Sequence, residues 1–259
     1  MTTQTNSLQG RVALVTGASA GIGRATALLL AARGARVMAV ARNEARLAEV
    51  ARLGGVETLA LSLEEEGACA RAVEETRKRL GPVAILVNNA GRGGFLDHPI
   101  WEESPENWRA TLALNLDVPF ELTRLAARDM RDRGWGRVIM VSSTAGEVGA
   151  PAMSAYCASK HGLIGLMRAA AQDLAKIGAT CNAVLPGWVR TEMAEQDTIR
   201  EAARRGMTTE AVWAERAAAY PGGRVLEPED IARVIAFLAG EDAAAVNAEA
   251  ITVSHGSLW

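Results

Sequence analysis

The stretch RVALVTGASAGIGRATALLL, residues 11–30, decides how this chain folds. Its first six residues are rich in Val and Leu and predict a strand that is buried on both faces. Glycines follow at positions 17, 21 and 23, and apolar residues then recur with helical spacing. A strand that turns through glycines into a helix brings backbone N–H groups and the positive end of the helix dipole together. We therefore expect a pyrophosphate to bind at this turn, although the same glycines would also suit a tight turn without a ligand.

The alternation of strand and helix continues outward along the chain. Helical patterns occupy residues 23–33, 44–52, 64–80, 105–133, 155–176 and 228–239, and strands are predicted at 11–16, 36–41, 58–62, 84–87, 137–142, 180–185 and 250–253. This order predicts an α/β fold: a single-domain, Rossmann-like, doubly wound parallel sheet of about seven strands with helices on both faces. A length of 259 residues suits one such domain over residues 1–259. Residues 188–225 interrupt the alternation with mixed polarity, and we expect a substrate lid there.

Composition argues against several classes of partner. The chain has 28 basic and 30 acidic residues and no long block of like charge, so neither nucleic acid nor an anionic membrane is expected. No apolar run is long enough to span a bilayer and the first residues lack a signal-peptide pattern, so we expect a soluble, cytoplasmic protein. The cysteines and histidines are scattered, and no metal site is expected; the cysteines are Cys69, Cys157 and Cys181.

A second pattern points to proton transfer. Tyr156 and Lys160 lie four residues apart in a predicted helix, and Ser143 ends a predicted strand. Residues at this spacing share a helix face, so the ammonium can lower the pKa of the phenol and make it usable near neutral pH. Ser143 can hydrogen-bond an oxygen whose charge changes. A Tyr–Lys pair alone also fits ordinary helix packing. Tyr220, the only other tyrosine, has no lysine four residues on, so its change to Phe is expected to be mild.

Six motifs together resemble those of the short-chain dehydrogenase/reductase family, in its order and at its spacing. They are the loop of residues 16–23, Asn88-Asn-Ala-Gly91, Asn115, Ser143, Tyr156 with Lys160, and Pro186-Gly-Trp-Val-Arg-Thr191. The resemblance covers essentially the whole chain and points to 3-oxoacyl and polyketide-type ketoreductases. It implies a nicotinamide-dependent oxidoreductase that acts on a CH–OH group or a ketone, and it implies a homotetramer.

The resemblance also implies roles for the catalytic residues. Tyr156 would be the general acid in reduction and the base in oxidation, with Ser143 holding the substrate oxygen. Lys160 would bind the nicotinamide ribose and lower the pKa of Tyr156. Asn115 would kink its helix and hold a water molecule that links Lys160 to solvent.

The same resemblance implies where a dinucleotide would bind. Thr191 and the backbone of Val189 would hold the carboxamide, so that the pro-S face of the nicotinamide meets the substrate. Thr16 and Asn89 are expected to be hydrogen-bonding scaffold residues, while Asn88 and Gly91 would support the adenosine-ribose side and the strand ends. The implied cofactor contacts are Gly17, Ser19, Gly21, Ile22, Gly23, Arg42, Asn43, Ser62, Leu63, Asn88, Ala90, Gly91, Tyr156, Lys160, Pro186, Gly187, Val189 and Thr191.

Two places depart from the family pattern. Ser62 stands near the position where the family usually has an acidic residue beside the adenine, so adenine binding can be altered without being lost. Near the C-terminus the chain reads Ala248-Glu-Ala-Ile-Thr-Val-Ser-His-Gly256, where relatives often read Gly-x-x-x-x-Val-Asp-Gly-Gly. That segment resembles a subunit-interface strand and loop, so the second departure bears on assembly rather than on catalysis.

NADP(H) is predicted over NAD(H). In NAD sites an acid about 20 residues after the glycine turn takes the ribose hydroxyl, whereas an arginine accommodates the 2′-phosphate. Here the second strand ends Val40-Ala-Arg-Asn43 without a carboxylate, so Arg42 is expected to bind the phosphate with Asn43 beside it. Arg42 can also be a solvated surface side chain, in which case an NAD-linked enzyme becomes the better interpretation.

The substrate pocket is expected to be mostly apolar, as small-molecule pockets are. No cluster of arginines marks an anionic substrate, although Arg92 and Arg190 lie near the motifs. Candidate lining residues are Phe95, Met153, Trp188 and Met193, with Met207 and Trp213 from the predicted lid.

These observations favour an NADPH-dependent carbonyl reductase that acts on a small-molecule ketone. One alternative is an NAD-linked dehydrogenase that oxidises a secondary alcohol with the same residues. A nucleotide sensor or scaffold without catalysis is a further alternative, but a sensor would not need the catalytic set. Apolar residues beyond one helix face predict a homotetramer, as the resemblance also implies; they are Leu163, Leu166, Met167 and Ala170.

Overall fold

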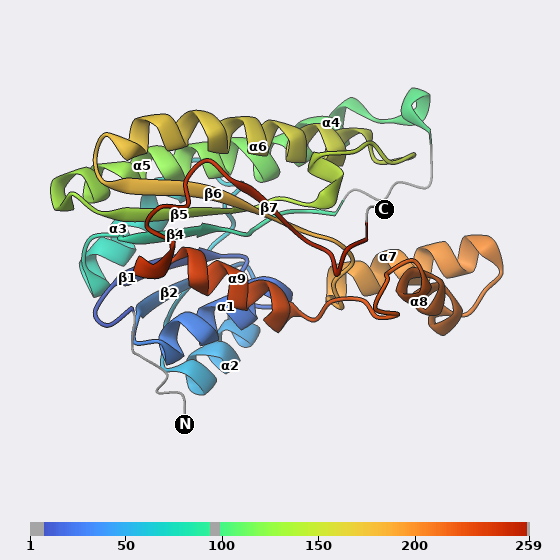
Figure 1. The fold of residues 1–259 in the computed structure, drawn as a ribbon, viewed down its shortest axis with the longest axis horizontal. Helices are drawn as coiled ribbons and strands as arrows, with labels where there is room; N and C mark the ends of the chain where they lie inside the picture. Colours follow the sequence, from blue (N-terminus) through green and yellow to red (C-terminus); the bar gives the residue numbers. More distant parts are fainter. Residues whose placement is uncertain (1–7, 94–98, 258–259) are drawn as a thin grey trace.

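The computed structural model describes residues 8–93 and 99–257. They contain one seven-stranded sheet in the order β3-β2-β1-β4-β5-β6-β7, in which all neighbouring strands are parallel (Figure 1). β2 and β3 lie on one side of β1, and β4 to β7 lie on the other, so the connection from β3 to β4 crosses over β1. This topology confirms the predicted doubly wound α/β fold. The strands are β1 (Val12–Thr16), β2 (Arg36–Ala41), β3 (Glu57–Ala60), β4 (Ile85–Asn88), β5 (Gly136–Val141), β6 (Ala179–Pro186) and β7 (Ala250–Val253).

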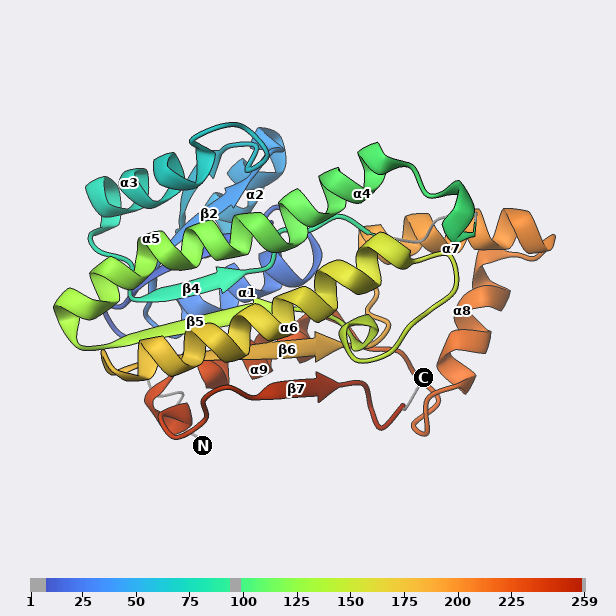
Figure 2. The ribbon, with the colours of Figure 1, turned by 90° about the horizontal axis from the view of Figure 1, so that it is seen from above.

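Helices cover both faces of the sheet (Figures 1 and 2). One face packs against α1 (Gly21–Ala32), α2 (Glu44–Gly54) and α9 (Pro228–Leu238). The other packs against α3 (Ala68–Leu80), α5 (Val118–Arg133) and α6 (Ser154–Ala175), with α4 (Pro105–Leu112) beside α6. Successive strand residues enter opposite cores, as Leu14 and Val15 do, and both are fully buried. The central strands are therefore buried on both faces, as their apolar sequences predict.

Two predicted helices have different limits in the structure. The helix predicted at residues 64–80 begins at Ala68, because Gly67 adopts a left-handed φ of 72° before it. The helix predicted at 105–133 is interrupted by a five-residue π-helical turn, η2 (Ala113–Asp117), which contains Asn115. Such turns often occur at functional sites, and this one matches the expected kink at Asn115.

The segment 188–225 is mostly helical. It contains α7 (Glu192–Arg205) and α8 (Thr209–Ala218), which project together beyond the end of the sheet (Figure 1). Short 3₁₀ turns complete the described structure: η1 (Ile100–Glu102), η3 (Thr144–Gly146) and η4 (Glu241–Ala243). Across residues 8–93 and 99–257, no helix has both the length and the apolar character needed to cross a membrane.

The C-terminal departures from the family pattern keep a glycine-like backbone. Ala248 has a φ of 64° and His255 a φ of 48°, and both stand where relatives often have glycine. A left-handed conformation costs a residue with a Cβ roughly 1–2 kcal/mol. The Ala248 N–H donates to the carbonyl oxygen of Cys181 at 3.0 Å, so pairing with β6 helps to hold this conformation.

The apolar residues predicted to form a subunit interface instead lie in or against the core. Leu163 and Met167 on α6 are almost fully buried against the sheet, and Leu166 and Ala170 pack beside them. The argument is therefore wrong for Leu163 and Met167, because this side of α6 packs on the sheet, whereas Leu166 and Ala170 are only partly buried and the prediction made from them stands.

Candidate active site

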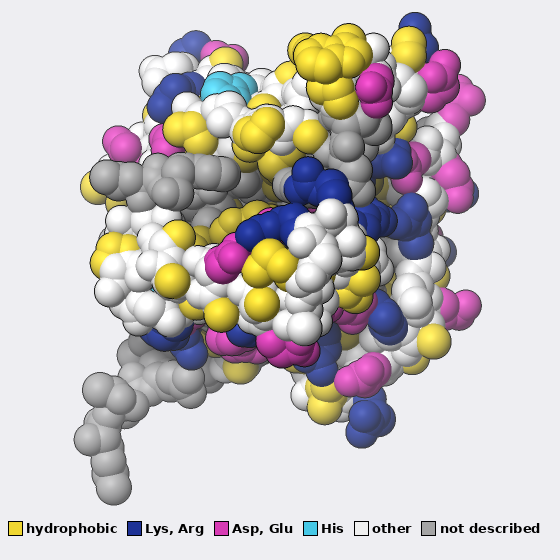
Figure 3. All heavy atoms as spheres, turned by 90° about the vertical axis from the view of Figure 1, so that its right-hand side faces the viewer, with side chains coloured by type: hydrophobic (Ala, Val, Ile, Leu, Met, Phe, Trp, Pro, Cys, Tyr) yellow, Lys and Arg dark blue, Asp and Glu magenta, His cyan; other side chains and the backbone are white. Residues whose placement is uncertain are grey.

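A deep pocket lies at the carboxyl ends of the strands. It has a volume of about 650 Å³ and is lined by Gly17 after β1, Asn89 after β4, Ser143 after β5 and Gly187 after β6. In doubly wound sheets this edge is where ligands bind. The pocket continues outward to α7 and α8, and Figure 3 looks onto that end of the molecule, where basic side chains gather beside a recess.

The glycine turn is shaped to hold a pyrophosphate. Gly17 has a φ of 65°, and a Cβ on Gly23 would lie 2.3 Å from the carbonyl oxygen of Gly17, so both positions require glycine. Helix α1 begins after Ala20 without a side-chain cap and without an acidic residue in its first turn. Its first N–H groups thus remain available to an anion. The turn fits the diphosphate of a dinucleotide.

A hydrogen-bond network fastens this turn to the loop after β4. The Thr16 hydroxyl accepts from the backbone N–H groups of Asn89 and Ala90, each at 3.0 Å, and donates to the carbonyl oxygen of Val87 at 3.2 Å. The Asn89 side chain donates to the carbonyl oxygen of Thr16 at 2.9 Å. Thr16 and Asn89 therefore act as scaffold residues, as predicted.

Asn88 lies inside the protein and does not line the pocket. Its amide donates to the hydroxyl of Thr123 at 3.2 Å. The side chain supports the end of β4 from within, so any contact that Asn88 makes with a cofactor would come from its backbone.

The predicted catalytic residues converge on one place. Ser143, Tyr156 and Lys160 all line the pocket. Asn115 lies behind them, where its Oδ1 accepts from the backbone N–H of Arg92 at 2.9 Å. A Cβ on Gly91 would lie 3.1 Å from Asn115 Oδ1 and 3.8 Å from Lys160 Nζ, so both side chains approach Gly91.

Burial governs the protonation of the Tyr–Lys pair. It raises the pKa of Tyr156 to about 12, while the hydrogen bond from Ser143 lowers it and the charge of Asp197 raises it further. Burial likewise lowers the pKa of Lys160 to about 8. The Lys160 ammonium donates to the carbonyl oxygen of Val141 at 2.8 Å and lies 5.6 Å from the centre of the Tyr156 ring.

The expected lowering of the Tyr156 pKa is thus wrong: the pKa is raised, and burial is the largest cause. The sequence argument considered only the spacing of the two groups on a helix. In the structure, the loss of hydration is the larger effect, because it disfavours the charged form of both groups. The ammonium is also held by Val141 and not by the phenol.

The predicted adenosine contacts lie outside the main pocket. The Arg42 side chain is 73% exposed, and its Nη1 is 3.5 Å from Oε2 of Glu64. Asn43 caps α2 by accepting from the backbone N–H of Arg46 at 3.0 Å. Ser62 is partly exposed and Leu63 is buried.

A second hollow of about 340 Å³ adjoins the glycine turn. Ser19 lines it together with Arg24 and Arg46. Arg46 forms an ion pair with Glu192, the first residue of α7, and thereby joins the nucleotide side of the molecule to the lid segment. Of the predicted glycines, Gly23 is a packing residue beneath the turn and lines neither hollow.

The outer part of the main pocket contains residues that the sequence did not single out for the site. Of the predicted substrate contacts, Met153, Trp188 and Met193 line this part of the pocket, whereas Met207 and Trp213 do not, and Phe95 falls outside the described residues. Several charged or polar lid residues also line it: Asp197, Glu201, Glu215, Arg216 and Tyr220. In the sequence their helical spacing is that of an ordinary solvated surface, so no local signal distinguishes them.

Known proteins resemble this chain in sequence and in fold. The model of the short-chain dehydrogenase family matches residues 11–202. The chain is 41% identical to a putative ketoacyl reductase of the monensin polyketide synthase from Streptomyces virginiae, over 95% of this chain and 96% of that protein. It is 34% identical to the 3-oxoacyl-[acyl-carrier-protein] reductase of Escherichia coli, over 96% and 97% of the two chains. A crystal structure of a variant actinorhodin polyketide ketoreductase with NADPH superposes with a TM-score of 0.89 at 37% identity, covering 99% and 98% of the two chains.

The lowered pKa of Lys160 predicts a pH dependence of stability. Between pH 8 and 10.5 the unfolded lysine binds a proton that the folded one has largely released, so the free energy of unfolding should rise with pH. Relative to Lys160→Met, the gain of the unmodified protein should be on the order of 3 kcal/mol across this window. Urea unfolding of both ligand-free proteins at a series of pH values measures it. Tyr156 titrates in both proteins and cancels in the difference; equal slopes would contradict the prediction.

Proposed function

The chain belongs to the short-chain dehydrogenase family, and on that premise we propose that it is an NADPH-dependent reductase of a small-molecule ketone. The observation that carries the proposal is the single pocket that joins the glycine turn to Ser143, Tyr156 and Lys160. A nucleotide sensor would need the turn but not these three side chains. The chain is thus an oxidoreductase that acts on a CH–OH group or its ketone.

Tyr156 is the proton donor in this proposal. When bound, the nicotinamide supplies the hydride. The pKa of Tyr156, raised to about 12 by burial, keeps the phenol protonated at neutral pH, which is the form that reduction requires. Oxidation needs the phenolate first, and burial makes that form costly. The protonated phenol can thus give its proton to the oxygen of a ketone as that oxygen gains charge.

Ser143 and Lys160 are proposed to bind the substrate oxygen and the nicotinamide ribose on either side of Tyr156. The Ser143 oxygen accepts from the backbone N–H of Ala145 at 3.1 Å, and its own O–H, which hydrogen-bonds Tyr156, can be donated instead to a substrate oxygen that binds between the two side chains. The Lys160 ammonium is fixed by Val141 and lies beside Gly91, where it can bind the nicotinamide ribose. A water molecule held by Asn115 remains part of the proposal.

Arg42 is proposed to select NADPH. Its ion pair with Glu64 is exposed to solvent, and exposed pairs contribute at most about 1 kcal/mol. A 2′-phosphate can therefore replace Glu64 as the partner of the guanidinium. The structural relative determined with NADPH supports the same choice.

The ketone is proposed to be of the 3-oxoacyl or polyketide type. The relatives named as ketoacyl reductases support this class. The pocket wall formed by Met153, Trp188 and Met193 suits an apolar chain next to the carbonyl. Residues 188–225 would act as the lid of this pocket within a single domain. The free thiols of all three cysteines fit the proposed cytoplasmic location.

A homotetramer is proposed on new grounds. Trp108 on α4 and Phe120 on α5 are 38% and 51% exposed, and Phe237 on α9 is 43% exposed. Large apolar side chains on two separate helical surfaces suit two kinds of subunit contact. Light scattering at micromolar concentration should give four times the mass of one chain, whereas the mass of a monomer would contradict the proposal.

Tyr156→Phe removes the proton donor and keeps the ring. Turnover of a ketone should fall by at least about 100-fold, while the dissociation constant of NADPH changes little. Steady-state kinetics and fluorescence titration measure the two quantities. Retained turnover would place the chemistry elsewhere.

Arg42→Ala tests the choice of cofactor. Because a guanidinium–phosphate contact is charge-assisted, the variant should lose roughly 1.5–3 kcal/mol of NADPH binding and bind NADH almost unchanged. Arg52→Ala, at the other end of α2, is the matched control and should alter neither affinity. If the unmodified protein prefers NADH, or the variant loses both cofactors equally, the NAD-linked alternative replaces this proposal.

A further inference from the structure

We propose that Arg216 and Tyr220 are positioning residues that hold Trp188 in place, and that Trp188 is the wall of the pocket that decides which face of a ketone is reduced. The inference rests on the proposed ketone reduction, because it concerns how the same pocket orients its substrate. All three residues line the pocket together with Tyr156. Trp188 belongs to the loop after β6, whereas Arg216 comes from α8 and Tyr220 from the turn that follows α8.

Tyr220 holds the backbone of Trp188. Its hydroxyl oxygen accepts from the Trp188 N–H at 2.5 Å, and the side chain is only 4% exposed. A Cβ on Gly187 would lie 2.4 Å from this hydroxyl, so the approach of Tyr220 requires glycine at that position. The loop that would hold the nicotinamide carboxamide is thus tied directly to the lid segment.

Arg216 holds the ring of Trp188. The centre of its guanidinium lies 3.5 Å from the centre of the Trp188 ring and 5.0 Å from that of Trp213. The two indoles meet edge to face, with ring centres 6.4 Å apart. Cation–π contacts are stronger where water is excluded, and Arg216 is 8% exposed. The indole of Trp188 therefore has a stacked charge against one face and a second ring beside it.

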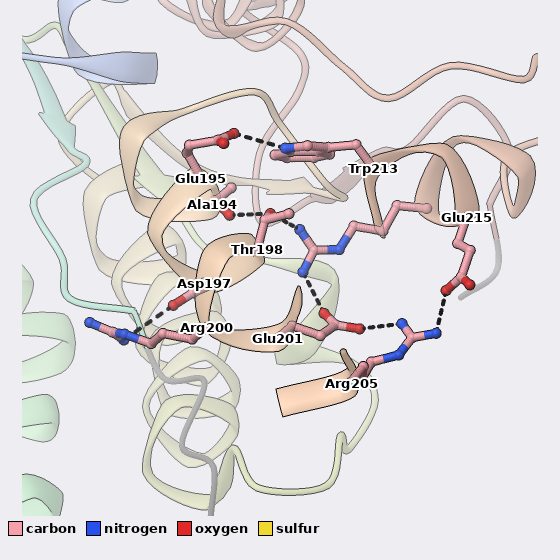
Figure 4. Close-up of polar contacts among 10 residues, drawn as sticks. Ala194, Glu195, Asp197, Thr198, Arg200, Glu201, Arg205, Trp213 and Glu215 are labelled. Carbon is pink, nitrogen blue, oxygen red and sulfur yellow. Dashed lines mark hydrogen bonds and ion pairs between the residues drawn. The ribbon is translucent and has the colours of Figure 1, made fainter. Parts of the chain in front are cut away.

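Arg216 is itself fixed by α7. One guanidinium nitrogen donates to the hydroxyl of Thr198, and another donates to Glu201 at 2.7 Å. Thr198 in turn donates to the carbonyl oxygen of Ala194 at 2.6 Å (Figure 4). A guanidinium forms hydrogen bonds at its edge and stacks with its face. The bonds to α7 thus leave the face of Arg216 for Trp188.

This arrangement leaves Arg216 unsuited to binding an anionic substrate. Its charge is balanced by Glu201, which also pairs with Arg205 at 2.8 Å; Arg205 pairs in turn with Glu215 at 2.6 Å (Figure 4). The structure thus gives Arg216 an orienting role. A ketone with one large and one small substituent must place the large group clear of the fixed Trp188 ring, so the position of this ring sets the configuration of the alcohol.

The first experiment compares Arg216→Lys with Arg205→Gln. Lysine keeps the charge opposite Glu201 but loses the planar face, whereas the Arg205 variant removes a partner of the same Glu201 without touching Trp188. Each variant reduces phenyl methyl ketone with NADPH, and chiral chromatography gives the ratio of the two alcohols. We expect Arg216→Lys to change this ratio by at least about threefold and to raise KM more than it lowers kcat, with Arg205→Gln unchanged. An unchanged ratio in Arg216→Lys, or an equal change in Arg205→Gln, would overturn the inference.

The second experiment needs no ketone. Tyr220→Phe leaves the partly buried N–H of Trp188 without its acceptor, so the dissociation constant of NADPH should rise by about two- to tenfold, while the thermal midpoint should fall by only a few degrees and the protein should stay folded at the temperature of the titration. This replaces the mild effect expected from the sequence, which took no account of the contact with Trp188. If Tyr220→Phe binds NADPH normally, the hold on Trp188 is refuted. If the unmodified protein binds NADPH but reduces no ketone, the proposed function fails, and the titration still tests the hold on Trp188.

Discussion

The whole site depends on the close approach of the glycine turn after β1 to the loop after β4. A Cβ on Gly17 would lie 2.9 Å from the Cα of Ala90, and a Cβ on Gly23 would strike the carbonyl oxygen of Gly17. Thr16 and Asn89 hold the two loops at this distance through hydrogen bonds. Because β1 and β4 are neighbours where the strand order reverses, the same contact opens the pocket between them. The nucleotide end and the catalytic end share this one junction.

Burial then decides what the catalytic residues can do. The pocket excludes enough water to move the pKa values of Tyr156 and Lys160 in opposite directions, each toward its neutral form. A protonated phenol suits donation to an oxygen that gains charge. The carbonyl oxygen of Val141 limits the cost of burying the ammonium by accepting its hydrogen bond. The end of β5 positions both groups that act on the Tyr–Lys pair. Val141, which binds the Lys160 ammonium, is the last residue of β5, and Ser143 follows two residues later.

The lid segment, residues 188–225, contributes most of the charged side chains that line the pocket. Its inner surface carries many polar contacts, with Arg216 against the rings of Trp188 and Trp213 and four carboxylates at the pocket. The segment is also joined to the nucleotide side by the pair of Arg46 and Glu192. A ligand that shifts α7 must therefore disturb contacts at both ends of the pocket. Contacts with the surrounding chain also matter at the C-terminus. There Ala248 and His255 adopt a left-handed backbone that is costly for residues other than glycine, so the neighbouring structure must hold it.

The sequence by itself determined the order of strands and helices, the glycine turn and the grouping of Ser143, Tyr156 and Lys160. Those features follow from local periodicity and from the rule that parallel strands end at one edge of a sheet. The sequence could not give the direction of the pKa values, the burial of Leu163 and Met167, or the contacts of Arg216 and Tyr220 with Trp188. Each of these depends on which distant segments meet and how much water they exclude. Spacing along a helix predicts which side chains share a face, but only the tertiary structure decides whether that face contacts the core, another segment or solvent.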